Sequence, residues 1–166
     1  MITQHQQLTE AKIIDEINKC GFTHVIWLPD SGNQALYEGL VKQLDVTVIP
    51  VCREGEAIAI AAGLTWVGKN PLLLHQNSGF LESGDSLRGI AFGTRLPLLI
   101  ILSYFGWKRE GPIVHTAAIY TEPVLKGWGI KYYLITSDED VAKISLAYKE
   151  AHDMKQPIVI LIGREL

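Results

Sequence analysis

The alternation of short apolar runs with longer segments of helical character constrains the fold of this chain more than any other feature. Each apolar run is rich in β-branched residues and is continuous, rather than alternating with polar residues. Such runs are typical of strands that are buried on both faces of a parallel sheet. The predicted strands lie at residues 23–29, 46–51, 71–75, 97–103, 131–135 and 157–162.

The segments between these runs are predicted to be helices, because apolar residues recur at helical spacing in the first of them. The predicted helices lie at residues 8–19, 33–43, 53–67, 83–94, 117–128 and 139–154. Such alternation predicts an α/β fold, a three-layer open parallel sheet of about six strands with helices on both faces. The 166 residues contain no repeat and no linker, so a single domain is expected over residues 1–166.

Composition bears on the partners and the compartment of the protein. The chain has 15 basic and 18 acidic residues and no long run of either sign, which disfavours nucleic-acid binding. It shows no signal peptide and no apolar stretch near the ~20 residues of a membrane helix, so a cytoplasmic protein is expected. Cys20 and Cys52 are interpreted as two buried apolar residues in a reducing compartment, with a modestly activated thiol at Cys52, beside Arg53, as the alternative.

Two motifs resemble known sites without matching them. Residues 63–70 nearly spell the phosphate-binding loop GxxxxGK[ST], but Asn70 stands where the metal-binding hydroxyl is needed, and the segment ends a helix instead of beginning one. Gly68 is interpreted as a helix C-cap. The five histidines show no metal-ligand spacing, so no metal site is expected in this chain.

In an open parallel sheet, ligands bind beyond the carboxyl ends of the strands. Four loops are expected along that edge, with the sequences PDSGN, CREGE, HQNSGF and SYFGWKREG. In the first loop, Asp30 and Ser31 have two open interpretations, a turn that caps the next helix or a contact with a ligand.

Two acids, Glu54 and Glu56, open the predicted helix at residues 53–67. Acids in a first turn often only complement the helix dipole. Residues 57–64, however, leave no polar face, so this helix is predicted to be buried on nearly every side. A carboxyl group at its start would be desolvated, which raises its pKa and lets the protonated form donate a hydrogen bond.

Residues 53–80 resemble the pyrimidine-binding (PYR) domain of thiamine-diphosphate enzymes, in which an E-x-x-A core opens a small-residue helix that is followed by a strand. The segment HQNSGF is similar to the Q-N-S-G turn of the sulfopyruvate and phosphonopyruvate decarboxylases. The segment LPDSGNQALYEGL resembles the loop P-G-x-x-x-x-x-L of the wider superfamily. The resemblance extends over about residues 25–135 and is nearest to the separate alpha subunit of sulfopyruvate decarboxylase.

The resemblance implies a role for Glu54. This residue matches the catalytic glutamate that hydrogen-bonds the pyrimidine ring of the cofactor and promotes its imino tautomer, whose nitrogen removes the thiazolium C2 proton to give the carbanion that attacks a 2-oxo acid. Glu56 is interpreted as structural. The resemblance also implies a cofactor-binding turn and, with lower specificity, a set of substrate contacts. The cofactor-binding residues are Gln76, Asn77, Ser78 and Gly79 beside Glu54, and the candidate substrate contacts are Asp30, Ser31, His75 and His115.

The sequence departs from the family after the turn, where Phe80, Leu81 and Glu82 replace a small residue, Gly and Asn. A bulky and an acidic side chain suit a compact sulfonate or phosphonate poorly, so a different 2-oxo acid, or ligation in place of decarboxylation, is a possible activity.

The family's diphosphate-binding motif, G-D-G followed by Asn, has no match, because Gly84-Asp85-Ser86 lacks the second Gly. The resemblance therefore implies a separate diphosphate-binding (PP, beta) subunit that holds Mg²⁺, with thiamine diphosphate across an α2β2 or larger interface. Trp66, Trp107 and Trp128 are interface anchors or core residues in this interpretation.

The implied function is that of the alpha subunit in a two-component thiamine-diphosphate-dependent 2-oxo acid decarboxylase, a carbon–carbon lyase. An acyl-transferring or acyloin-forming synthase subunit is the alternative within enzymes. A non-catalytic binding or regulatory module of the same fold is the alternative outside them. A free-standing hydrolase is disfavoured, because no nucleophile with a base is visible in the sequence.

Overall fold

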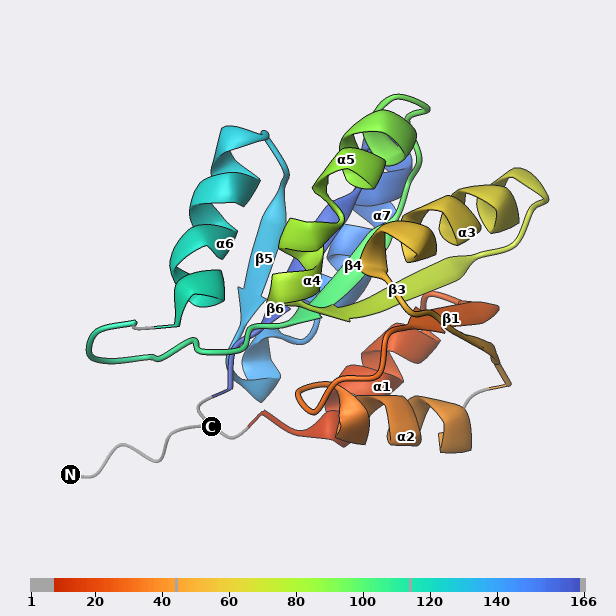
Figure 1. Ribbon diagram of the computed structural model, residues 1–166. Helices are drawn as coiled ribbons and strands as arrows, with labels where there is room; N and C mark the ends of the chain where they lie inside the picture. Colours follow the sequence, from red (N-terminus) through yellow and green to blue (C-terminus); the bar gives the residue numbers. More distant parts are fainter. Residues whose placement is uncertain (1–7, 44, 114, 165–166) are drawn as a thin grey trace.

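A six-stranded sheet in which every neighbouring pair of strands is parallel forms the centre of the computed structural model, which describes residues 8–43, 45–113 and 115–164 (Figure 1). The strand order is β2-β1-β3-β4-β6-β5. The strands are β1 (His24–Trp27), β2 (Thr47–Pro50), β3 (Pro71–Gln76), β4 (Leu99–Ser103), β5 (Tyr132–Ile135) and β6 (Ile158–Ile162).

Helices cover both faces of this sheet, and each face has its own apolar core. Figure 1 shows α1 and α2 on the opposite side of the sheet from α3. Side chains alternate along a strand, so Val25 and Trp27 enter one core while Ile26 enters the other. The predicted three-layer α/β architecture is therefore confirmed. The helices are α1 (Glu10–Asn18), α2 (Gln34–Gln43), α3 (Glu54–Trp66), α4 (Asn77–Glu82), α5 (Gly84–Ser86), η1 (Leu87–Phe92), α6 (Thr116–Gly127), η2 (Asp138–Asp140) and α7 (Lys143–Met154).

Several predicted elements differ from the observed ones. The strand at residues 46–51 was expected to be buried, but β2 is only partly covered because it forms an edge of the sheet. The helix expected at residues 83–94 is divided into α5 and η1, and α4 precedes it in place of a loop. Ser83 marks the break: its ψ of 3° departs from helical geometry, and its hydroxyl donates to the carbonyl of Phe80 at 2.9 Å. The helix expected at residues 139–154 is likewise divided into η2 and α7.

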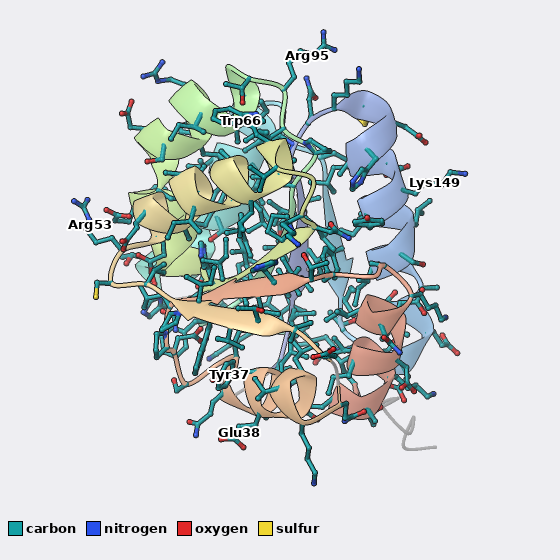
Figure 2. The ribbon with its side chains drawn as sticks, turned by 90° about the vertical axis from the view of Figure 1, so that its right-hand side faces the viewer. Tyr37, Glu38, Arg53, Trp66, Arg95 and Lys149 are labelled. Carbon is teal, nitrogen blue, oxygen red and sulfur yellow. The ribbon has the colours of Figure 1, made fainter. Side chains whose placement is uncertain are left out.

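Helix α3 is exposed along one side, so the expectation that it is buried nearly all round is wrong. Ala57, Ile58, Ala61 and Ala62 pack on the sheet, but Trp66 is 64% exposed. Figure 2 shows Trp66 on the outer side of the helix. A helix that lies on a sheet buries one face, and within the described part of the chain nothing covers the other. The apolar outer face therefore faces solvent.

Two local predictions concern the ends of elements and the cysteines. Gly68 follows α3 with φ +78°, and its N–H donates to the Thr65 carbonyl at 3.0 Å, which confirms its role in ending the helix. Cys20 is buried, and burial raises the pKa of its thiol to about 12. Cys52 is exposed, so its expected burial is wrong, because the β2–α3 connection runs along the surface. Among the described residues, no helix has the length and apolarity to cross a lipid bilayer.

Candidate functional site

The loop after β1 is tied to the ends of β3 and β4. The Asn33 side-chain amide donates to the carbonyl of His75 at 2.6 Å. Asp30 Oδ1 accepts hydrogen bonds from the Asn33 N–H at 3.0 Å and from the Ser103 hydroxyl at 3.2 Å. Asp30 thus forms the capping turn that was one of its two interpretations, and it fixes the loop before α2.

Ser31, next to this turn, lines a cavity of about 150 Å³ at the same edge of the sheet. Ser103 and Ile162 contribute to its wall, and their strands direct these side chains toward the core that α1, α2 and α7 cover. Arg164 also lines the cavity and pairs with Glu10 of α1 at 2.5 Å. Asp30 and Ser31 therefore lie toward the α1–α2 side of the sheet edge.

Glu54 lies on the other side of the sheet edge, as the first residue of α3. Its side chain is half-buried and contacts α4 at Gly79, where an added Cβ would collide with the Glu54 carboxyl group and its Cγ. Only glycine leaves space for this carboxyl group, so the structure brings together two of the residues that the resemblance picked out. Within the described residues the carboxyl group forms no hydrogen bond, which leaves its oxygens free for a ligand.

Helix α4 begins with Asn77, which is completely buried. Its side-chain amide donates to the Phe105 carbonyl and to the Thr121 hydroxyl, each at 3.2 Å. Its Oδ1 has no partner among the described residues. Asn77 therefore fixes the start of α4 against the loop after β4 and against α6. Its neighbour Ser78 is exposed and donates to the Gln76 side-chain oxygen at 2.7 Å.

His75 lies one residue before the end of β3, and its ring is only 1% exposed. Burial lowers the pKa of this histidine to about 4, so the imidazole is neutral near pH 7. Side-chain alternation along β3 places the ring on the same face as Leu73, beneath α3 and α4. The neutral His75 ring is therefore buried under α3 and α4 and supports the turn at residues 76–79 by packing.

His115 forms the N-cap of α6 and meets the loop after β4. Its ring stands edge-on to Phe105, with the ring centroids 4.6 Å apart. Gly106 has φ +82°, and an added Cβ there would collide with the His115 side chain. Because Asn77 donates to the Phe105 carbonyl, His115 and Asn77 are held through one shared loop residue.

Sequence reasoning missed the role of Glu82, the last residue of α4. Its Oε1 accepts from Arg53 Nε at 3.0 Å, and its Oε2 accepts from the Gly55 N–H at 3.2 Å. Of the two residues after the turn that bear on substrate choice, Phe80 is buried in the core, whereas Glu82 pairs with Arg53 and lines a cavity. No sequence signal predicts such pairing, because the partners are 27 and 29 residues apart.

The first turn of α3 and the α4–α5 segment also border a second cavity, of about 370 Å³, which is lined by Arg53, Gly55, Glu56, Glu82, Asp85 and Ser86. Glu56 accepts a hydrogen bond from the Cys52 N–H at 3.3 Å, a capping contact in keeping with a structural role. In residues 8–43, 45–113 and 115–164, no group of three or more His, Cys, Asp or Glu side chains is placed to hold a metal ion.

Comparison with known proteins gives one family match. The model of the family "Thiamine pyrophosphate enzyme, N-terminal TPP binding domain" matches residues 9–110. The sulfopyruvate decarboxylase subunit alpha of Methanococcus maripaludis is 28% identical over 86% of each chain. The sulfopyruvate decarboxylase of Methanosarcina acetivorans is 24% identical over 93% of this chain but only 40% of that protein.

Two solved structures share the fold. The 2-oxoglutarate:ferredoxin oxidoreductase from Magnetococcus marinus superposes with a TM-score of 0.74 at 14% identity, over 92% of this chain and 28% of that chain. The benzoylformate decarboxylase from Polynucleobacter necessarius superposes with a TM-score of 0.70 at 19% identity, over 97% of this chain and 32% of that chain. This chain therefore corresponds to about a third of each solved chain, and at these identities the likeness concerns the fold alone.

Proposed function

Because this chain belongs to the thiamine pyrophosphate enzymes, whose N-terminal TPP binding domain it matches over most of its length, we propose that it is the alpha (pyrimidine-binding) subunit of a two-component 2-oxo acid decarboxylase. Relatives named as sulfopyruvate decarboxylase subunit alpha and as phosphonopyruvate decarboxylase support this reaction class. The observation that carries the proposal is the contact between the Glu54 carboxyl group and Gly79 at the carboxyl edge of the sheet.

The residues at this edge fit the pyrimidine half of thiamine diphosphate. Glu54 offers a half-buried carboxyl group whose oxygens form no hydrogen bond within the described chain, and Asn77 carries a buried oxygen that is likewise without a partner there. A pyrimidine ring has the nitrogen acceptors and amino donors that complement such groups. When bound, thiamine diphosphate supplies the electron sink that lets a 2-oxo acid lose carbon dioxide.

The chemistry of this chain itself centres on one proton. In the proposed mechanism the Glu54 carboxyl group would bind the pyrimidine half of the cofactor and would hold or release a proton at its own oxygen, which is a general acid–base role. Gly79 leaves room for the carboxyl group, and Asn77 keeps α4 in place through its bonds to Phe105 and Thr121. Burial lowers the pKa of His75 to about 4, so this ring is too weak a base to take the proton at neutral pH.

The test is Glu54→Gln in the complex purified with its partner, with release of carbon dioxide from 2-oxo acids as the assay. Glu56→Gln is the matched control, because it removes one charge from the same turn. We expect turnover to fall at least about 100-fold in the first variant and to change little in the control. Unchanged turnover in Glu54→Gln would refute the proposal. An acceptor aldehyde in the assay separates decarboxylation from carboligation.

The proposal includes a separate diphosphate-binding subunit that holds Mg²⁺. The apolar outer face of α3, where Trp66 and Val67 are 64% and 72% exposed, supports an interface there. Three of the relatives' names contain "subunit alpha" together with an enzyme name, which also supports a partner. Native mass spectrometry of the tagged chain, purified with thiamine diphosphate and magnesium in every buffer, should find a second chain with cofactor bound. Elution of the chain alone and without cofactor would contradict this part.

A further inference from the structure

The first turn of α3 is capped from another helix rather than by its own N-cap residue. Arg53 occupies the N-cap position in an extended conformation, with no capping hydrogen bond from its side chain. The initial N–H groups of a helix lack partners within the helix. Here the Gly55 N–H donates to Glu82 Oε2 at 3.2 Å. The carboxylate of Glu82 therefore does for α3 what an Asp or Ser at the N-cap does in most helices.

The second oxygen of Glu82 binds the residue on the other side of Glu54. Arg53 donates to Glu82 Oε1 through Nε at 3.0 Å and also through Nη2. The pairing with Arg53 is the main reason that the pKa of Glu82 is lowered, so this carboxylate is charged near pH 7. The Glu82 carboxylate thus binds the side chain of Arg53 and the backbone of Gly55, the two neighbours of Glu54.

Helix α4 provides both the carboxylate that binds these two residues and the space for the Glu54 side chain. Gly79 and Glu82 are three residues apart on α4, a spacing that places them on neighbouring positions of one helix face. Gly79 contacts the Glu54 carboxyl group, and Glu82 holds the turn that carries it. A Cβ at Gly55 would lie 3.0 Å from the Ser86 hydroxyl, so the first turn of α3 also lies close against α5. The position of the Glu54 carboxyl group is therefore set by contacts between helices.

We propose that Glu82 is a positioning residue for Glu54: by holding Arg53 and Gly55, it sets the place of the Glu54 carboxyl group above Gly79. This inference rests on the proposed function, since it takes Glu54 as the group that meets the cofactor. It gives a role to the acid that departs from the family pattern after the Q-N-S-G turn. Misplacement of a reacting group by about 1 Å is enough to slow catalysis by orders of magnitude.

The test variant is Glu82→Gln, assayed in the complex with its partner and cofactor. The matched control is Asp85→Asn, which removes a negative charge from the same segment but pairs with Arg88, not with α3. We expect kcat of Glu82→Gln to fall about tenfold with KM for the 2-oxo acid unchanged, and the control to stay within about twofold. The conservative variant Glu82→Asp, which keeps the charge, should fall in between.

A double variant separates positioning from a general loss of stability. If Glu82 acts only through Glu54, then Glu54→Gln combined with Glu82→Gln loses no more activity than Glu54→Gln alone. Losses that multiply would overturn the inference. If Glu54→Gln itself keeps full turnover, the proposed function fails. If Glu54→Gln is inactive while Glu82→Gln equals the Asp85→Asn control, only the present inference fails.

Hydrogen exchange provides a readout that does not depend on activity. In the chain without cofactor, Glu82→Gln should speed amide exchange in residues 54–58 at least fivefold, while β3 and α6 keep their protection. Asp85→Asn should leave residues 54–58 unchanged. Faster exchange throughout α3, α4 and β3 would identify Glu82 as a general structural residue and overturn its positioning role. Unchanged exchange at residues 54–58 would overturn it as well.

Discussion

The two faces of the sheet are built differently. On one face, α1 and α7 turn aliphatic side chains such as Ile13, Ile17 and Ile144 into the core and polar ones to solvent. On the other face, small residues of α3 lie against the sheet, while Trp66 and Tyr120 are 64% and 58% exposed. The first face resembles the surface of a finished globular protein, and the second has the large exposed aromatic side chains that are enriched at interfaces.

The difference shows where stability and function are separated in this molecule. On the α3–α4 side, the Glu54 carboxyl group and the Asn77 Oδ1 are among the polar groups near the site that have no hydrogen-bond partner within the described residues. On the α1–α2 side, the loop after β1 is held by hydrogen bonds that join Asp30 to Asn33 and Ser103. Large exposed aromatic side chains and a carboxyl group without a partner in the described chain suit the α3–α4 face to a ligand and a partner, whereas the other face mainly holds the fold together.

The largest loss of activity should come from Gly79→Ala, on the face of the sheet that α3 and α4 cover. The new Cβ would occupy the place of the Glu54 carboxyl group and displace it, so turnover should fall at least about 100-fold. The melting temperature and turnover of the complex are the measurements. Gly89→Ala is the control, because a Cβ there meets nothing within 4 Å. A fully active Gly79→Ala complex would contradict the assignment of the site.

Ile17→Ala on the opposite face should affect stability alone. Ile17 is 0% exposed in the core beneath α1, and loss of its side chain leaves a cavity. The free energy of unfolding, measured by urea denaturation, should fall by about 2–5 kcal/mol. The kcat of the folded complex should stay within about twofold of the parent. A kcat that falls together with stability would show that the two faces are not separable in this way.

Acid should lower the free energy of unfolding through His75, which lies on the face of the sheet that α3 and α4 cover. Burial lowers the pKa of His75 from 6.5 to about 4 in the folded protein, so the unfolded chain takes up a proton first as the pH falls. The free energy of unfolding should therefore decrease between pH 6.5 and 4, by about 3 kcal/mol at most. Below pH 4 the contribution of His75 should not change further.

Urea denaturation across that pH range measures the slope. His75→Gln should flatten it, whereas His152→Gln, on the exposed side of α7, should retain it. Equal slopes for the two variants would mean that other groups cause the loss of stability in acid.

Trp66→Asp is expected to have the smallest effect on folding. It also tests most directly whether the α3 face, and not the opposite face of the sheet, binds a partner. Because the side chain is 64% exposed, the free energy of unfolding should change by less than about 0.5 kcal/mol. Association with the diphosphate-binding subunit should weaken at least about tenfold, as measured by native mass spectrometry at several concentrations. Leu146→Asp on α7, 46% exposed on the opposite face, is the control. Equal association of both variants would place the interface elsewhere.

The family match over residues 9–110 confirms the resemblance to thiamine-diphosphate enzymes that the segments around Glu54 and Asn77 indicated. The place of both residues at one edge of the sheet was predictable from local sequence, because each follows a predicted strand and the carboxyl ends of parallel strands meet at one edge. The pairing of Glu82 with Arg53 and Gly55 was not predictable from the sequence. It joins residues that are distant in the chain, and they meet only because α3 packs against α4.

The sequence by itself determined the alternation of strands and helices, the parallel sheet and the acid at the start of α3, because hydrophobic periodicity and helix-end chemistry act over a few residues. The tertiary structure alone decided which side of α3 is covered, that Cys52 is exposed, and that Gly79 lies under Glu54. The physical reason is that burial and contact depend on which elements pack together, and a run such as residues 57–64 is equally apolar whether one side of its helix meets the sheet or every side is enclosed.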